Sequence, residues 1–218
     1  MAYFGNGKSK IELAAKLTNV PVIGLYDQGE DAALMKLGNS TGGACIALCL
    51  RWLGCTMLNR NFWETTFKGK NQLKDPNILD SVMGWLENCD SVTRNQRIQT
   101  LAGNLGLAKY QGKTKSEMNW EAGMLKKGGA GLLEEVFDAD CHSMMGLAQG
   151  ATIGGSAGEG HALAFIRTAE DARRFYDPNF GEFIVTEWNF ELFLTQLWRL
   201  GKYDVFRSFL IRRYHPRA

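Results

Sequence analysis

The chain has 218 residues, of which 45% are hydrophobic and 22% are charged, and this balance excludes disorder over most of its length. A formal net charge of +2 is too small for a protein that binds nucleic acid through a basic surface. The longest apolar run, 44–50, is far shorter than the about 20 residues of a membrane-spanning helix. We therefore expect one domain over 1–218, with about 1–30 as an N-terminal extension.

The cysteines and the N-terminus indicate a protein without structural disulfides. Five cysteines, an odd number, stand at 45, 49, 55, 89 and 141 without a Cys-x-x-Cys pair, which favours a reducing compartment over a disulfide framework. Paired zinc-ligand spacing is also missing around Cys141 and His142, and we expect no metal or organic cofactor. The first residues lack the apolar segment of a Sec-type signal peptide.

The first two thirds of the chain are predicted to be mostly helical. The apolar positions of 45–53 lie nearly all round a helix, which is typical of a buried one. Asp75-Pro76 is a typical helix start, and apolar residues then recur at 79, 82, 83 and 86 on one helix face. Further helices are expected over 11–17, 98–105, 116–125 and 132–137.

From about residue 151 the pattern changes from helices to strands. Short apolar segments separated by turns predict antiparallel strands over 161–166, 174–176 and 182–185. Asn189 is expected to cap a helix that continues through Leu200, and a last strand is expected over 205–213. Helices followed by strands are typical of an α+β fold with an antiparallel sheet.

Basic residues collect near the C-terminal end. They are interpreted as the protected edge of the sheet, while a weak contact with an anionic membrane surface stays open as an alternative. These residues are Arg199, Lys202, Arg207, Arg212, Arg213 and Arg217.

Cys45 is the candidate nucleophile. It follows Gly42-Gly43-Ala44 and opens a predicted helix, where free N–H groups and partial positive charge favour a thiolate. The alternative is a buried core cysteine, like Cys49 one helical turn later. Asn39, six residues upstream, and the backbone N–H of Cys45 are the candidate oxyanion donors, although Asn39 also fits a simple turn.

His161 is the candidate base, because it begins a strand after a glycine-rich turn. His142 is expected on a helix, and His215 stands three residues from the end. Asp177 follows His161 by sixteen residues, a distance that strand, turn and strand would cover, and its carboxylate would orient the imidazole. The alternatives are a structural histidine and an aspartate that serves only the turn Asp-Pro-Asn-x-Gly.

A rival motif, Gly-x-Ser-x-Gly at 154–158, matches the nucleophile elbow of α/β-hydrolases. Asp177 and His215 follow it in the order of that class. The elbow needs a strand before it and a helix after it, whereas here a helical region precedes it and a strand follows. The sequence therefore disfavours a serine hydrolase.

Three short motifs in one order carry a resemblance to a known family. They are Gly43-Ala44-Cys45, Gly160-His161-Ala162 and the run Tyr-Asp-Pro-Asn-Phe-Gly-Glu-Phe at 176–183. Over about 39–183 the chain resembles the YopT/AvrPphB-type papain-like cysteine peptidases, which are bacterial effectors. The glycine-rich segment 103–160 departs from the pattern and leaves the substrate open.

The resemblance implies an α+β, papain-like fold whose nucleophile helix packs with the helical half on an antiparallel sheet. It also implies a triad in which Cys45 is the nucleophile, His161 the general base and then acid, and Asp177 the orienting carboxylate. The expected protein is a monomeric thiol endopeptidase that binds a host protein substrate and no nucleic acid. A specialised bacterial secretion system would deliver it to the host-cell cytoplasm.

Two other functions stay open at this point. The same triad could act on a glutamine side chain, as in a deamidase or a transglutaminase-like toxin. A papain-like fold could also serve as a binding module without catalysis.

Overall fold

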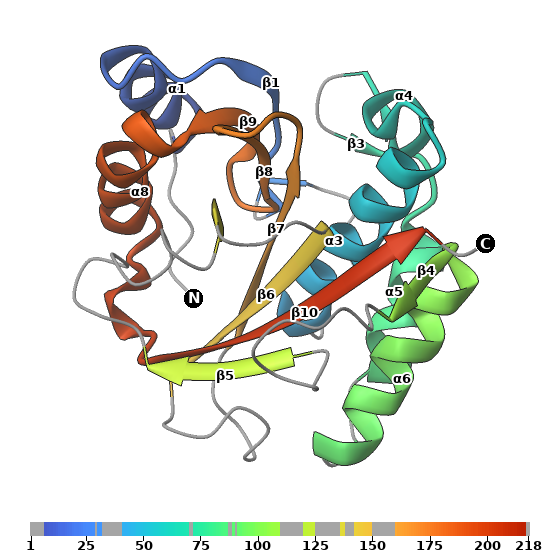
Figure 1. Ribbon diagram of the computed structural model, residues 1–218. Helices are drawn as coiled ribbons and strands as arrows, with labels where there is room; N and C mark the ends of the chain where they lie inside the picture. Colours follow the sequence, from blue (N-terminus) through green and yellow to red (C-terminus); the bar gives the residue numbers. More distant parts are fainter. Residues whose placement is uncertain are drawn as a thin grey trace.

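An antiparallel sheet with helices on both sides forms the framework of the protein (Figure 1). The computed structural model describes residues 7–28, 30–31, 41–69, 72–86, 89, 91–109, 120–124, 136–137, 142–149 and 160–216. Within them, eight strands form one sheet in the order β1-β9-β8-β7-β6-β10-β4, and β5 also pairs with β10. Helices α1 and α8 lie on one side of this sheet, and α3, α5 and α6 lie on the other.

The strands of the large sheet are short, and the described pairings between them are antiparallel. They are β1 (Val22–Leu25), β4 (Leu107–Lys109), β5 (Trp120–Met124), β6 (His142–Ala148), β7 (His161–Arg167), β8 (Ala172–Asp177), β9 (Gly181–Thr186) and β10 (Ser208–Pro216). A separate hairpin consists of β2 (Phe67–Lys68) and β3 (Gln72–Leu73).

Local hydrogen bonds explain where two of the helices begin. The Asp75 carboxylate accepts the Ile78 N–H over 3.3 Å, which confirms the predicted cap before Pro76. Asn189, expected as the cap of α8, is instead its third residue, and its side chain accepts the Thr186 N–H over 2.8 Å, as in a capping box. The helices are α1 (Gly7–Leu17), α3 (Thr41–Met57), α4 (Phe62–Thr66), α5 (Pro76–Leu86), α6 (Ser91–Asn104) and α8 (Glu187–Gly201).

Two clusters of buried side chains cover the two faces of the sheet. Leu163 and Phe165 of β7 belong to one cluster, whereas Ala162, Ala164 and Ile166 belong to the other. This alternation is what a strand with both faces buried requires. The α8 cluster includes Ile11, Phe175, Phe183, Phe190, Phe193, Trp198 and Tyr203, and the α3 cluster includes Ala44, Cys45, Cys49, Trp52, Met83, Ala162 and Ala164.

The predicted elements with clear hydrophobic periodicity are confirmed. For the helices these are the segments expected over 11–17, 45–53, 76–86 and 98–105, and for the strands those over 161–166, 174–176, 182–185 and most of 205–213. The α+β fold class is confirmed as well.

Two segments expected to be helical are strands. His142 begins β6, and residues 120–124 of the helix expected over 116–125 form β5. Both strands pair with β10, which lies far along the chain, so local periodicity does not contain the interaction that decides their conformation. Residues 110–119 and most of the helix expected over 132–137 lie outside the described residues.

The segment 7–28, expected as part of an N-terminal extension, contributes to the sheet and to the α8 cluster. β1 pairs with β9, and Ile11 of α1 is fully buried. No helix within the described ranges is long and apolar enough to cross a membrane.

The interpretation of the C-terminal basic residues as a sheet edge is wrong. β10 pairs with β6 on one side and with β4 and β5 on the other, so it lies inside the sheet. Arg212 and Arg213 are only 6% and 7% exposed, and burial lowers the pKa of Arg212. These two residues therefore do not contribute to an exposed basic surface.

Candidate active site

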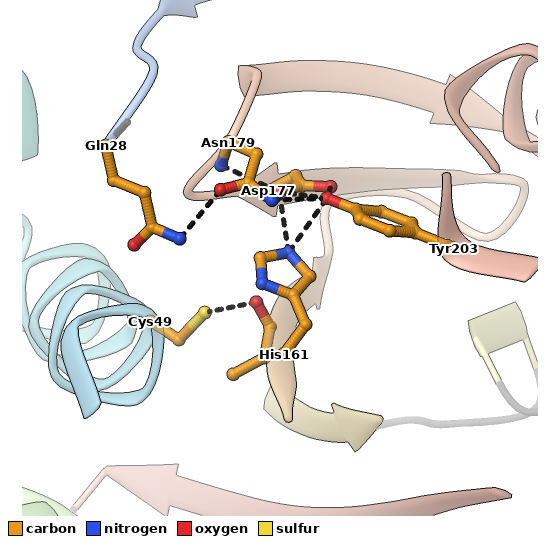
Figure 2. A network of polar contacts seen from close by, with 7 residues as sticks. Gln28, Cys49, His161, Asp177, Asn179 and Tyr203 are labelled. Carbon is orange, nitrogen blue, oxygen red and sulfur yellow. Dashed lines mark hydrogen bonds and ion pairs between the residues drawn. The ribbon is translucent and has the colours of Figure 1, made fainter. Parts of the chain in front are cut away.

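A histidine and an aspartate at the ends of two paired strands form a buried ion pair. His161 is the first residue of β7, Asp177 is the last of β8, and the strands are antiparallel, so these two ends lie at the same edge. The His161 Nε2 atom lies 2.9 Å from Asp177 Oδ1, and the side chains are 5% and 0% exposed (Figure 2). The strand–turn–strand arrangement predicted from the spacing is therefore present.

The turn after Asp177 also needs this residue. The Asn179 N–H donates to Asp177 Oδ1 over 2.8 Å, and the Phe180 N–H donates to the Asp177 carbonyl over 3.0 Å, as in an Asx-type turn. The turn leads to Gly181, which has φ +124° and whose Cβ would lie 2.1 Å from the Gly24 carbonyl oxygen. Asp177 thus serves the turn and contacts the histidine at once.

A tyrosine that no sequence motif marks extends this polar network. Tyr203 lies in the short helix η2 (Tyr203–Val205) after α8, and its hydroxyl oxygen lies 3.0 Å from both Asp177 Oδ2 and His161 Nε2. The Asn179 amide donates to that oxygen over 2.8 Å, and the Gln28 amide donates to Asn179 Oδ1 over 2.7 Å. Figure 2 shows His161, Asn179 and Tyr203 around Asp177, with Gln28 directed toward Asn179.

Cys45 lies on α3, but the helix begins earlier than expected. α3 starts at Thr41, so Cys45 is its fifth residue and lies just beyond the free N–H groups of the helix start. The side chain is buried in the α3 cluster, with 1% exposure of the residue. The prediction that Cys45 opens the helix is therefore wrong by about one turn, and the helix dipole acts on it less strongly than at the terminus.

The charges around His161 favour an imidazolium. Burial lowers the pKa of His161, but the Asp177 carboxylate and a hydrogen bond with the Cys45 side chain raise it, and the result is a pKa of about 10. The ring directs Nε2 toward Asp177, while its other nitrogen lies on the side of α3 (Figure 2). An imidazole with a carboxylate on one side and a thiol on the other can support a thiolate–imidazolium pair.

Cys49, one turn after Cys45, shows the ordinary behaviour of a core cysteine. Its thiol lies 3.4 Å from the Ala162 carbonyl oxygen, which joins α3 to β7. Burial raises the pKa of this thiol well above its usual range, so it stays protonated and unreactive at neutral pH.

The remaining candidates lie apart from this network or outside the described residues. Asn39, Cys141 and the Gly-x-Ser-x-Gly segment at 154–158 lie outside the described residues. His142 lies on β6, and His215 is exposed on β10. Asp177 pairs with His161, which precedes it in the chain, so the order Ser, Asp, His of the α/β-hydrolases does not describe this pair. Over the described ranges, no group of three His, Cys, Asp or Glu side chains could hold a metal ion.

Comparison with known proteins gives a family and a fold. The Peptidase_C58 family, described as Yersinia/Haemophilus virulence surface antigen, matches residues 27–205. The structure is similar to that of the Pseudomonas avirulence protein AvrPphB, with a TM-score of 0.52 and 15% identity over 80% of this chain and 93% of that chain. No curated protein sequence matches the chain.

Two further solved structures are less similar. One is PatoxP, a cysteine protease-like domain of the Photorhabdus asymbiotica toxin PaTox, with a TM-score of 0.44 and 13% identity over 96% of this chain and 60% of that chain. The other is the YopT domain of the Pasteurella multocida PfhB2 toxin, with a TM-score of 0.36 and 18% identity over 87% of this chain and 91% of that chain.

The similarity to AvrPphB identifies the fold as papain-like. In this chain the helical half contributes α3, and the antiparallel sheet contributes β7 and β8. The region matched by the family begins just before Gln28 and includes His161, Asp177 and Tyr203. The polar network thus lies wholly inside the part of the chain that the family describes.

Proposed function

This chain belongs to the Peptidase_C58 family, and on that premise we propose that it is a thiol endopeptidase acting as a bacterial virulence effector on a host protein. The observation that carries the proposal is the buried His161–Asp177 pair with Cys45 hydrogen-bonded to the same imidazole. These three residues come from α3, β7 and β8, so the helical half supplies the thiol and the sheet supplies the base.

The proposed reaction is acyl transfer to Cys45 followed by hydrolysis. The Cys45 sulfur attacks the carbonyl carbon of the scissile amide, and the C–N bond breaks as His161 gives its proton to the leaving amine. A water molecule then attacks the thioester and gives a proton to His161, and the carboxylic acid product leaves as the thiolate is restored. Asp177 remains a carboxylate throughout and keeps the ring oriented.

The oxyanion of the tetrahedral intermediate needs hydrogen-bond donors. In the proposal these are the side-chain amide of Asn39 and the backbone N–H of Cys45. Because α3 begins at Thr41, a regular helix directs the Cys45 N–H to the Thr41 carbonyl. The backbone N–H is then available only in part, so Asn39 supplies the larger share of the stabilisation.

The proposal extends to the setting of the reaction. The enzyme acts as a monomer on a host protein in the host-cell cytoplasm, after delivery by a specialised bacterial secretion system. The chemistry uses the side chains and water, with no metal or organic cofactor. The virulence description of the family and the avirulence protein among its structural neighbours support this setting.

The test compares host lysate incubated with the wild type and with Cys45→Ala, followed by mapping of new protein N-termini. We expect new N-termini with the wild type and none with the variant. Cys55→Ala is the matched control, because Cys55 lies nearly three turns further along α3 and contacts Thr65 instead of His161. Cleavage that survives in Cys45→Ala would overturn the proposal.

Thiol labelling tests the same site without a substrate. At pH 6 an ordinary thiol is almost wholly protonated, so a brief pulse of iodoacetamide should label Cys45 well before Cys49, Cys55, Cys89 or Cys141. The small reagent is chosen because Cys45 is only 1% exposed. Equal labelling of several cysteines would contradict an activated Cys45.

The same incubation separates the peptidase from the other functions. A deamidase or transglutaminase-like toxin would release ammonia from glutamine side chains without new N-termini. A binding module would do neither, and it would retain host-protein binding in Cys45→Ala. Either result would replace the proposed activity.

A further inference from the structure

We propose that Tyr203 is a positioning residue, whose hydroxyl holds the Asp177 carboxylate and, through it, the orientation and charge of the His161 imidazole. The inference rests on the proposed function, because it concerns how the same three residues are kept ready for thiol chemistry. It adds a fourth residue, from η2, that neither the sequence motifs nor the family resemblance indicates.

The first argument is the division of donors between the two carboxylate oxygens. Asp177 Oδ1 lies 2.9 Å from His161 Nε2 and accepts the Asn179 N–H over 2.8 Å. The Tyr203 hydroxyl lies 3.0 Å from Asp177 Oδ2 and 3.2 Å from Oδ1, and in the described part of the chain it is the donor to Oδ2. A buried carboxylate is stabilised when both oxygens accept hydrogen bonds, so loss of the hydroxyl leaves Oδ2 without compensation.

The second argument is the direction of the hydrogen bonds. The Asn179 amide donates to the Tyr203 oxygen over 2.8 Å, which leaves the single hydroxyl proton free for a carboxylate. A protonated His161 has only donors on its ring, so Tyr203 cannot donate to Nε2 although the two atoms lie 3.0 Å apart. The proton of Tyr203 therefore belongs to Asp177, and the His161 Nε2–H is shared between Asp177 and the tyrosine oxygen.

The third argument is that packing leaves the Tyr203 ring little freedom. The residue is 3% exposed, and its ring lies edge-on to Trp198 at 5.3 Å and beside the His161 ring at 5.0 Å. Burial and the Asp177 charge raise the pKa of the Tyr203 hydroxyl, so it remains a donor. A donor that is held in place before the reaction begins costs no reorganisation during it.

The test uses Tyr203→Phe, which removes the hydroxyl and keeps the ring. Tyr214→Phe is the matched control, because Tyr214 is 1% exposed and its hydroxyl has no hydrogen-bond partner among the residues that the structure describes. On a peptide that spans the mapped cleavage site, we expect kcat of Tyr203→Phe to fall about tenfold, as for the loss of one hydrogen bond to a charged group. The KM should change little, and Tyr214→Phe should behave as the wild type does.

A second readout is the titration of His161, followed by NMR of its ring in both variants. The titratable groups that face His161 are Asp177 from β8, Tyr203 from η2 and Cys45 from α3. Without the hydroxyl, the His161 Nε2–H loses the tyrosine oxygen that shares it, and the carboxylate is held less firmly beside the ring. We therefore expect Tyr203→Phe to lose the His161 proton at a lower pH than the wild type does. A merely structural tyrosine would lower the melting temperature and leave this titration unchanged.

Asn179→Ala provides a second variant should Tyr203→Phe fold poorly. It keeps the backbone N–H that binds Asp177 and removes the amide that aligns the tyrosine. We therefore expect a smaller decrease in kcat and a smaller shift of the His161 titration than in Tyr203→Phe. A wild type that cleaves, together with Tyr203→Phe and Asn179→Ala that match it in kcat and in His161 titration, would overturn the role of Tyr203. A wild type that neither cleaves nor shows a reactive Cys45 would overturn the proposed function instead, and the His161 titration would still decide the role of Tyr203.

Discussion

Near the candidate site, strand β7 carries side chains of different size on its two faces. On the α3 side lie Ala162 and Ala164 of β7. The small residues Cys45 and Cys49 of α3 belong to the same cluster, which also contains large rings such as Trp52. On the α8 side, aromatic rings meet, as where Phe183 and Phe193 lie 4.8 Å apart. Small side chains let a helix approach a strand closely, which the 3.4 Å contact from the Cys49 sulfur to the Ala162 carbonyl illustrates.

The candidate site lies at the end of β7, and each face of the sheet contributes one of the two reacting side chains. Cys45 belongs to the α3 cluster. His161 alternates along β7 with Leu163 and Phe165 on the face that belongs to the α8 side, and its ring stacks on Phe206. The approach of α3 thus sets how near the thiol comes to the imidazole, and the aromatic packing sets how the imidazole is oriented. Changes on the two faces should therefore have separable effects.

The largest expected effect comes from the carboxylate that holds the His161 imidazole between the two faces. Asp177→Asn should lower kcat about 10³-fold or more, because the ring loses the carboxylate that orients it and stabilises its charge. The variant should still fold, since asparagine also forms the turn, although it loses the stabilisation that the carboxylate gives the charged His161. Asp75→Asn, at the start of α5, is the control for the same chemical change. Wild-type cleavage by Asp177→Asn would show that the carboxylate serves only the turn.

The next prediction concerns the α8 side alone. Phe193→Ala should lower the free energy of unfolding by about 3–5 kcal/mol, because it empties a fully buried aromatic site. Below the melting temperature, activity per folded molecule should persist. Leu192→Ala, at a position 56% exposed, should cost far less in the same urea titration. Equal losses of unfolding free energy in the two variants would show that burial in the α8 cluster does not stabilise the fold.

The third prediction concerns the segment that precedes α3. Asn39→Ala should lower kcat about 10²-fold with little change in KM, as for the loss of one oxyanion donor. Ser40→Ala is a control at the adjacent position. Full activity of Asn39→Ala in steady-state cleavage would make Asn39 a turn residue only.

A smaller effect is expected from crowding the close face. Ala164→Val adds two methyl groups between β7 and the α3 side, which should cost about 1–3 kcal/mol of stability and should lower kcat by moving Cys45 away from His161. Val185→Ile, which adds one methyl group, is the comparison on the α8 side, where it should cost stability without lowering kcat. Equal losses of kcat in both variants would remove the proposed division between the faces.

The last prediction concerns the pH dependence of stability and involves no measurement of activity. The pKa of His161 rises from 6.5 to about 10 on folding, so its contribution is complete below pH 6.5 and is lost as the pH rises through 10. Between these values the wild type should lose more stability than His161→Gln, measured as melting temperature against pH. Parallel curves for the two proteins would show that His161 does not carry this charge in the folded state.

Some parts of the site could be predicted from the sequence and others could not. Asp-Pro-Asn-x-Gly and the strand pattern around His161 are local signals, and the pairing of β7 with β8 follows from a short turn between them. The start of α3 at Thr41 was missed because Gly42 and Gly43 are typical of a turn. Tyr203 was missed because its role depends on contacts with β7 and β8, and no spacing along the chain indicates them.

The sequence by itself determined the α+β class, the helices and strands with clear periodicity, and the His161–Asp177 pair, because turns and periodicity act over short distances. Tertiary structure alone decided that 120–124 and 142–148 are strands, since both depend on pairing with β10. It also decided that the C-terminal strand lies inside the sheet, and that Tyr203 reaches Asp177. These features come from contacts between segments far apart in the chain, where the free energy depends on a partner that the local sequence does not contain.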